Sequence, residues 1–88
     1  MAWTIEVASG ARKQLRKLDH SVKRRIEDFL ATRIAQLDDP RAVGKPLMGE
    51  LSRYWAYRVG DYRLLCELVD EKLIVLVVDV GHRREVYR

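Results

Sequence analysis

The period of the hydrophobic pattern differs between the two halves of this 88-residue chain, and that difference limits the fold more than any other feature. Between residues 8 and 37, apolar side chains recur every three to four positions, which is typical of helices with one buried face. Beyond residue 54 the period becomes two, which is typical of strands. Helices that precede a run of strands predict an α+β domain.

The helical part is expected to form a two-helix hairpin. Residues 19–21 interrupt the apolar pattern, and Pro40 ends the second helix because proline disfavours a helical residue before it. A connection of about three residues predicts antiparallel helices. The two apolar stripes are Ala8, Ala11, Leu15 and Leu18, and Val22, Ile26, Phe29, Leu30, Ile34 and Leu37.

The remaining elements are expected to form a small sheet. The predicted strands are residues 3–7, 54–59, 62–69 and 72–80. The last three form an antiparallel meander, and the apolar run 73–80 is expected to be central and covered on both faces. Residues 41–52 read as a loop. We therefore predict one α+β domain over residues 1–88, with an antiparallel-rich four-stranded sheet, the order β-α-α-β-β-β, and the helical hairpin packed on one face.

The charge of the chain favours a polyanionic partner. Lysine and arginine number 17 and the acids 13, for a net charge of +4, and arginine outnumbers lysine 12 to 5. The positive charge is concentrated at residues 11–25, where Asp19 is the one acid. A solvated surface is the ordinary interpretation of such a helix face. The alternative is contact with an RNA backbone through Arg12, Lys13, Arg16, Lys17, Lys23, Arg24 and Arg25.

Several classes of protein are disfavoured by what the sequence lacks. Two histidines and one cysteine make no metal-ligand pattern, and no glycine-rich phosphate loop occurs, so we expect neither a metal nor a small-molecule cofactor. Cys66 lies in an apolar run and is expected to be a core residue. The start of the chain does not resemble a signal peptide, and the longest apolar run is too short to cross a bilayer. A cytoplasmic protein without a membrane partner is therefore expected.

The candidate chemistry lies at strand ends. Arg58 and Arg63 flank the turn at residues 60–61, so a hairpin brings them together in any register. His82, Arg83 and Tyr87 follow the last predicted strand. Guanidinium, imidazole and phenol groups suit RNA cleavage by the 2′-hydroxyl, which needs charge stabilisation and proton transfer but no metal. Taken singly, a strand-end arginine is more often a solvated charge, so the residues alone indicate only a basic domain that contacts a polyanion.

Three segments carry a resemblance to a known family. They are Tyr57-Arg58-Val59-Gly60-Asp61-Tyr62-Arg63-Leu64-Leu65, Val69-Asp70-Glu71-Lys72 and Val80-Gly81-His82-Arg83-Arg84-Glu85-Val86-Tyr87. Together with Ala11-x-x-Gln14-Leu15-x-Lys17-Leu18, they resemble the RelE toxins of the RelE/ParE superfamily. The resemblance implies a toxin of a type II toxin–antitoxin system that enters the ribosome and cleaves mRNA in the A site. It also implies a RelB-like antitoxin as the cognate partner, besides ribosomal RNA and mRNA.

The resemblance assigns roles to the strand-end residues. Arg63 and Arg83 would hold the scissile phosphate, and Tyr87 would stack on the codon or take part in proton transfer. Arg58 would align with a catalytic lysine, and His82 with a basic residue beside the catalytic arginine. Arg84 would contribute to RNA binding.

The sequence departs from this family pattern at one strand position. Well-known members carry a second lysine two positions before the first, and here that position holds Ala56. One cation of the cluster is therefore missing, and His82 is a candidate to take over its work. Two alternatives stay open at this stage: a ParE-like inhibitor of DNA gyrase, and a catalytically decayed homologue that only binds its antitoxin.

Overall fold

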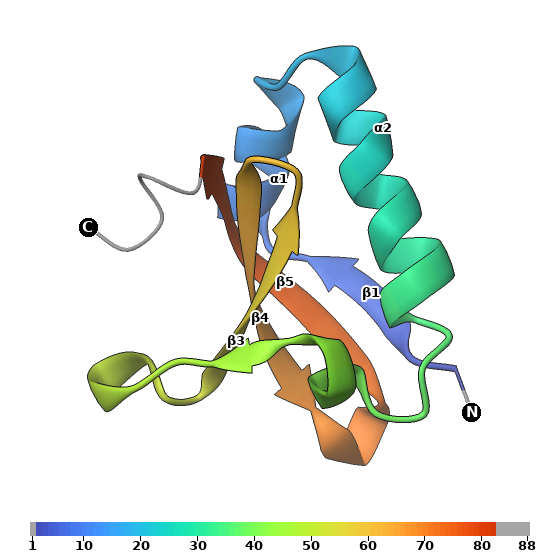
Figure 1. The fold of residues 1–88 in the computed structure, drawn as a ribbon, viewed down its shortest axis with the longest axis vertical. Coiled ribbons are helices and arrows are strands. Elements are labelled where there is room, and N and C mark those ends of the chain that lie inside the picture. Colours follow the sequence, from blue (N-terminus) through green and yellow to red (C-terminus); the bar gives the residue numbers. More distant parts are fainter. Residues whose placement is uncertain (1, 83–88) are drawn as a thin grey trace.

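The computed structural model describes residues 2–82, which form two helices and one sheet (Figure 1). The helical elements are α1 (Ser9–Arg16), α2 (His20–Asp28), the π-helical turn η1 (Phe29–Ile34) and the short 3₁₀ turns η2 (Pro40–Val43), η3 (Gly49–Leu51) and η4 (Asp70–Lys72). The strands are β1 (Thr4–Val7), β2 (Lys45–Pro46), β3 (Tyr54–Val59), β4 (Tyr62–Val69) and β5 (Ile74–His82). The predicted α+β class is confirmed.

The sheet has five strands in the order β1-β5-β4-β3-β2, one more than the sequence predicts. β1 runs parallel to β5, and the remaining neighbours are antiparallel. The additional strand is β2, in the segment predicted to be a loop, where Lys45 pairs with Ala56 and Pro46 with Trp55. Two residues carry no readable alternation, and Pro46 argues against a strand except at a sheet edge, which is where β2 lies.

The helical hairpin is confirmed, with residues 17–19 joining α1 to α2. After Asp28 the second helix widens into a π-helical turn, in which the Ala35 N–H donates to the Leu30 carbonyl at 2.9 Å. The widened turn still presents Leu30 and Ile34 to the core, so the predicted apolar stripe holds although the period inside it changes. Because the spacing of the apolar residues is compatible with an α-helix as well as with a π-helical turn, the sequence does not predict this turn.

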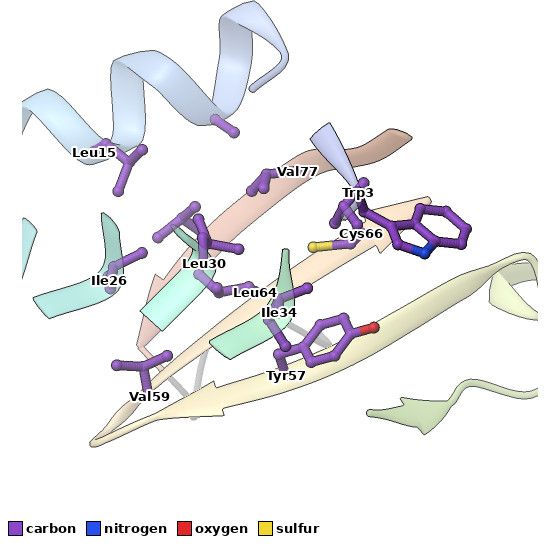
Figure 2. Close-up of a cluster of buried hydrophobic side chains, with 13 residues drawn as sticks. Trp3, Leu15, Ile26, Leu30, Ile34, Tyr57, Val59, Leu64, Cys66 and Val77 are labelled. Atoms are coloured by element: carbon purple, nitrogen blue, oxygen red, sulfur yellow. The ribbon is translucent and has the colours of Figure 1, made fainter. Parts of the chain in front are cut away.

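The core lies between the helices and one face of the sheet (Figure 2). Ile26, Leu30 and Ile34 meet Tyr57 and Leu64 there. The core also contains Ala11, Leu15, Cys66, Val75, Val77 and Val80. The predicted burial of Cys66 is confirmed, and burial raises the pKa of its thiol to about 12.

Strand β5 lies inside the sheet as predicted, between β1 and β4. Its coverage on both faces is not complete, because the helices cover one face only. Val75, Val77 and Val80 are buried, whereas Ile74 and Leu76 are half-buried. The second face of the sheet is therefore partly open, and it carries the site described below.

Candidate functional site at the open face of the sheet

The β3–β4 hairpin brings two arginines into direct opposition. Arg58 pairs with Arg63 in the antiparallel register, across the turn made by Gly60 in a left-handed conformation, φ +59°. Directly opposite residues project from the same face, with Cβ atoms about 5 Å apart. This confirms the expectation that the hairpin joins them. The Arg58 Nε atom donates to the Gly60 carbonyl at 3.4 Å, so the side chain lies along the turn.

The alternation of the strands decides which face carries these arginines. Tyr57, Val59 and Leu64 are core residues that face the helices. Their neighbours Arg58 and Arg63 therefore project from the opposite, open face. Arg58 is exposed and Arg63 half-buried, so the pair lies at the surface with one member partly withdrawn from water.

A cavity of about 230 Å³ lies beside the arginine pair. It is bounded by the β2 region on one side and by β3 and β4 on the other. The lining residues are Val43, Lys45, Pro46, Leu47, Ala56, Tyr57, Arg58 and Arg63. The cavity thus combines three cationic side chains with apolar walls, a composition that suits a phosphate together with the apolar face of a nucleotide.

Lys45 is a residue of this site that the sequence did not single out. It enters because β2 pairs with β3, and the register sets Lys45 opposite Ala56. A lysine in a segment with Gly44 and Pro46 gives no signal of its own. Only a prediction of the two-residue edge strand would have found it.

His82 lies in a different group of side chains. It pairs with Tyr62, and the two rings meet edge to face with centroids 5.7 Å apart. Because Tyr62 and Arg63 are adjacent in one strand, they project from opposite faces. His82 and Tyr62 line a groove of about 520 Å³ beside α1, together with Lys17. The structure therefore brings Arg58 and Arg63 together and places His82 nearer the basic helices. Arg83, Arg84 and Tyr87 lie outside the described residues.

The basic hairpin residues lie at the surface of α1, α2 and their connection. Lys23 is half-buried, and the others are exposed, namely Arg12, Lys13, Arg16, Lys17, Arg24 and Arg25. Arg25 reaches the arginine pair's turn, since a Cβ added at Gly60 would lie 3.1 Å from its Nη1 atom. The β3–β4 turn that joins the strands of the two arginines thus lies at the same end of the molecule as the basic helices (Figure 1).

Tyr57 is the aromatic residue among those that line the cavity, and its hydroxyl makes a hydrogen bond inside the fold. That hydroxyl donates a 2.9 Å hydrogen bond to the Pro40 carbonyl, and burial is the main cause that raises its pKa above the ordinary value. A tyrosine held protonated in this way is a poor general base. Within residues 2–82 there is also no group of three or more His, Cys, Asp or Glu side chains that could hold a metal ion.

The fold and site together define a small α+β protein with a basic helical hairpin and an arginine pair on an open sheet face. The family model for the ParE toxin of the type II toxin–antitoxin system parDE matches residues 5–87, and the chain belongs to this family. Curated relatives show that the chain is a toxin of the RelE type. The resemblance seen in the sequence is thereby confirmed.

The relatives match along nearly their whole length. The chain is 34% identical to Toxin RelG of Mycobacterium tuberculosis over 88 residues, covering 100% of this chain and 99% of the relative. It is 33% identical over 90 residues to the mRNA interferase toxin RelE of Escherichia coli, covering 99% and 92%. Among solved structures, the toxin–antitoxin complex RelBE2 of M. tuberculosis gives a TM-score of 0.87 at 32% identity, covering 94% of this chain and 100% of that one. No helix in the described part of the chain is long and apolar enough to span a membrane.

Proposed function

We propose that this toxin is a ribosome-dependent endoribonuclease that cleaves mRNA in the ribosomal A site without a metal. The observation that carries the proposal is the direct opposition of Arg58 and Arg63 beside a cavity lined by cationic and apolar residues. The E. coli relative is named an mRNA interferase, which supports the same class of activity. The coupling to the ribosome and the independence from metal come from the resemblance to RelE toxins.

The reaction that suits these groups is attack by the RNA 2′-oxygen on the neighbouring phosphorus. The P–O5′ bond breaks, leaving a 2′,3′-cyclic phosphate and a 5′-hydroxyl. Arg58, Arg63 and Arg83 would hold the phosphate and stabilise the negative charge that grows on its oxygens. The 2′-hydroxyl proton must be removed and the leaving oxygen protonated. Tyr87 is a candidate for one of these transfers, and His82, which projects from the face opposite Arg63, is a candidate only for RNA that passes around the end of β5.

The basic helices would hold the protein on ribosomal RNA. Their exposed lysines and arginines, with Arg84, would contact phosphates, which fix position without reading sequence. Arg25 would link this surface to the catalytic end, since it packs at Gly60 beside the arginine pair. A cognate RelB-like antitoxin is the other proposed partner, supported by the similarity to the toxin of the RelBE2 complex.

Primer extension on an mRNA in a purified translation system, with and without ribosomes, tests the proposal. The parent protein should cut within codons only when ribosomes are present. Arg63→Ala and Arg83→Ala should each lower the cleavage rate by on the order of 10²-fold or more, because each removes a charge from the transition state. Arg33→Ala, an exposed arginine in η1, is the matched control and should leave the rate unchanged. Undiminished cleavage by correctly folded Arg63→Ala protein would refute the site.

Inhibition of DNA gyrase is the second candidate function, because the family model that matches bears the ParE name. A supercoiling assay with purified gyrase separates the two. Inhibition of supercoiling without mRNA cleavage would establish the ParE-like activity. A decayed homologue that only binds antitoxin would show neither effect, and its induced expression would not arrest growth.

A further inference from the structure

The edge strand β2 carries a lysine to the position that lacks one in β3. Lys45 is directly opposite Ala56 in the antiparallel register, so both side chains project from one face. Ala56 has no charge and little volume, and the Lys45 side chain shares the cavity with Arg58 and Arg63. The cavity therefore holds three cations, although β3 itself lacks the lysine that the family pattern would place at position 56.

Buried packing holds the backbone around Lys45 in place. Gly44 lies against the ring of Tyr57, so closely that an added Cβ would be 2.9 Å from its Cε1 and Cζ atoms. Tyr57 is 1% exposed, and its hydroxyl bonds the Pro40 carbonyl at the start of the same segment. The Leu47 N–H then donates to the Tyr54 carbonyl at 3.3 Å. The backbone on both sides of Lys45 is thus held against β3, while the exposed ammonium stays available at the rim.

We infer that Lys45 is a phosphate-contacting residue of the catalytic site, which supplies from β2 the cation absent at Ala56. Its ligand is the phosphodiester of single-stranded RNA, and the inference rests on the proposed endoribonuclease function. A lysine ammonium is a compact point charge on a flexible stem. A lysine on β2 therefore reaches the same phosphoryl oxygen as a lysine on β3, the strand that carries Arg58.

A relocation experiment tests the role in cleavage. Lys45→Gln should lower the rate in the translation system by on the order of 10²-fold, as loss of one charge-stabilising group does. Lys45→Gln combined with Ala56→Lys returns a lysine to the same face, with Cβ about 5 Å away, and should recover the rate to within about tenfold. Lys72→Gln, an exposed lysine in η4, is the matched control and should cleave like the parent.

Binding of a 2′-O-methyl RNA oligonucleotide, which cannot be cleaved, gives a second readout. Each phosphate contact contributes about 0.7 to the slope of log affinity against log salt for a single strand. Lys45→Gln should flatten that slope by about this amount, and the Lys45→Gln/Ala56→Lys protein should restore it. A role in folding alone would lower the unfolding midpoint without changing the slope.

The outcomes separate this inference from the proposed function. If Arg63→Ala abolishes cleavage but Lys45→Gln keeps the parent rate and salt slope, the role of Lys45 is wrong and the nuclease stands. Loss of activity in Lys45→Gln that Ala56→Lys does not restore also overturns it. A parent protein that never cleaves mRNA overturns the proposed function, and the salt slopes then still report whether Lys45 binds RNA phosphate.

Discussion

The Gln14 side chain makes the hydrogen bonds to β5 that a strand partner would make beyond the end of β1, and its removal should lower the free energy of unfolding. β1 pairs with β5 only from Ile74 to Val77, and the Ala8 N–H donates the last backbone bond, to the Val77 carbonyl. Beyond this point the Gln14 side chain takes over. Its Oε1 atom accepts from the Val80 N–H at 2.8 Å, and its Nε2 atom donates to Asp79 Oδ1 at 2.7 Å. A primary amide is the uncharged side chain that offers both an acceptor and a donor in this geometry.

The size of the effect follows from these two bonds. Gln14→Ala leaves the part-buried Val80 N–H without its partner, which costs about 1–3 kcal/mol, and removes a bond to a carboxylate. Water can reach half-buried Asp79 and replace part of the second bond. We therefore expect a loss of about 2–4 kcal/mol in the free energy of unfolding, a large share of the ~4–13 kcal/mol typical of this length.

Urea unfolding followed by tryptophan fluorescence measures this loss, and an exchange of roles tests its cause. Gln14→Glu should be as damaging as Gln14→Ala, because two carboxylates would face each other. Asp79→Asn should be mild, since the oxygen of the introduced amide can still accept from Gln14. The double substitution Gln14→Glu/Asp79→Asn reverses donor and acceptor and should recover most of the stability. Amide exchange at Val80 should follow the same order. A Gln14→Ala loss below about 0.5 kcal/mol, or no recovery in the double variant, would refute the reasoning.

Three further predictions concern the packing and the pH dependence. Gly44→Ala drives a methyl group into the buried ring of Tyr57 and should lower the free energy of unfolding by about 1–3 kcal/mol in urea titrations; an unchanged midpoint would contradict it. Arg41 donates to both carboxylate oxygens of Asp70, at 3.0 and 2.7 Å, and its hydrogen bond is the main cause that lowers the pKa of Asp70. That stabilisation is present above the unfolded pKa of about 4 and is lost as pH falls through the lower folded value. Asp70→Asn should therefore reduce the dependence of the free energy of unfolding on pH in this range. A pH profile identical to that of the parent would count against a stabilising Arg41–Asp70 pair. The Cys66 thiol, with its pKa raised to about 12 by burial, should resist alkylation at pH 8 in the folded protein and react in urea; rapid reaction of the native protein would show that the core opens.

The parts of the fold that the sequence predicts are those that neighbouring residues determine. Residues 60–61 force β3 and β4 together, so the opposition of Arg58 and Arg63 needs no knowledge of the rest of the sheet. The helical stripes likewise predict the core face because every third or fourth residue is apolar. β2 depends instead on contacts distant in sequence, namely Gly44 on the Tyr57 ring and the pairing of Lys45 with Ala56. No local pattern records these contacts, and Lys45 was missed for that reason.

The position of His82 illustrates a different limit. His82 would be expected close to the arginines, because it pairs with Tyr62, the residue next to Arg63. Adjacent residues of a strand project from opposite faces, so one step in register separates the imidazole from the guanidinium pair by the thickness of the sheet. The groove that His82 lines with Lys17 belongs to the side of the basic helices. If His82 nonetheless transfers a proton, RNA must pass around the end of β5 so that one nucleotide meets both faces. If it does not, His82→Ala should weaken binding to the ribosome while Tyr87→Phe lowers the rate of cleavage, and single-turnover rates at saturating ribosome distinguish the two.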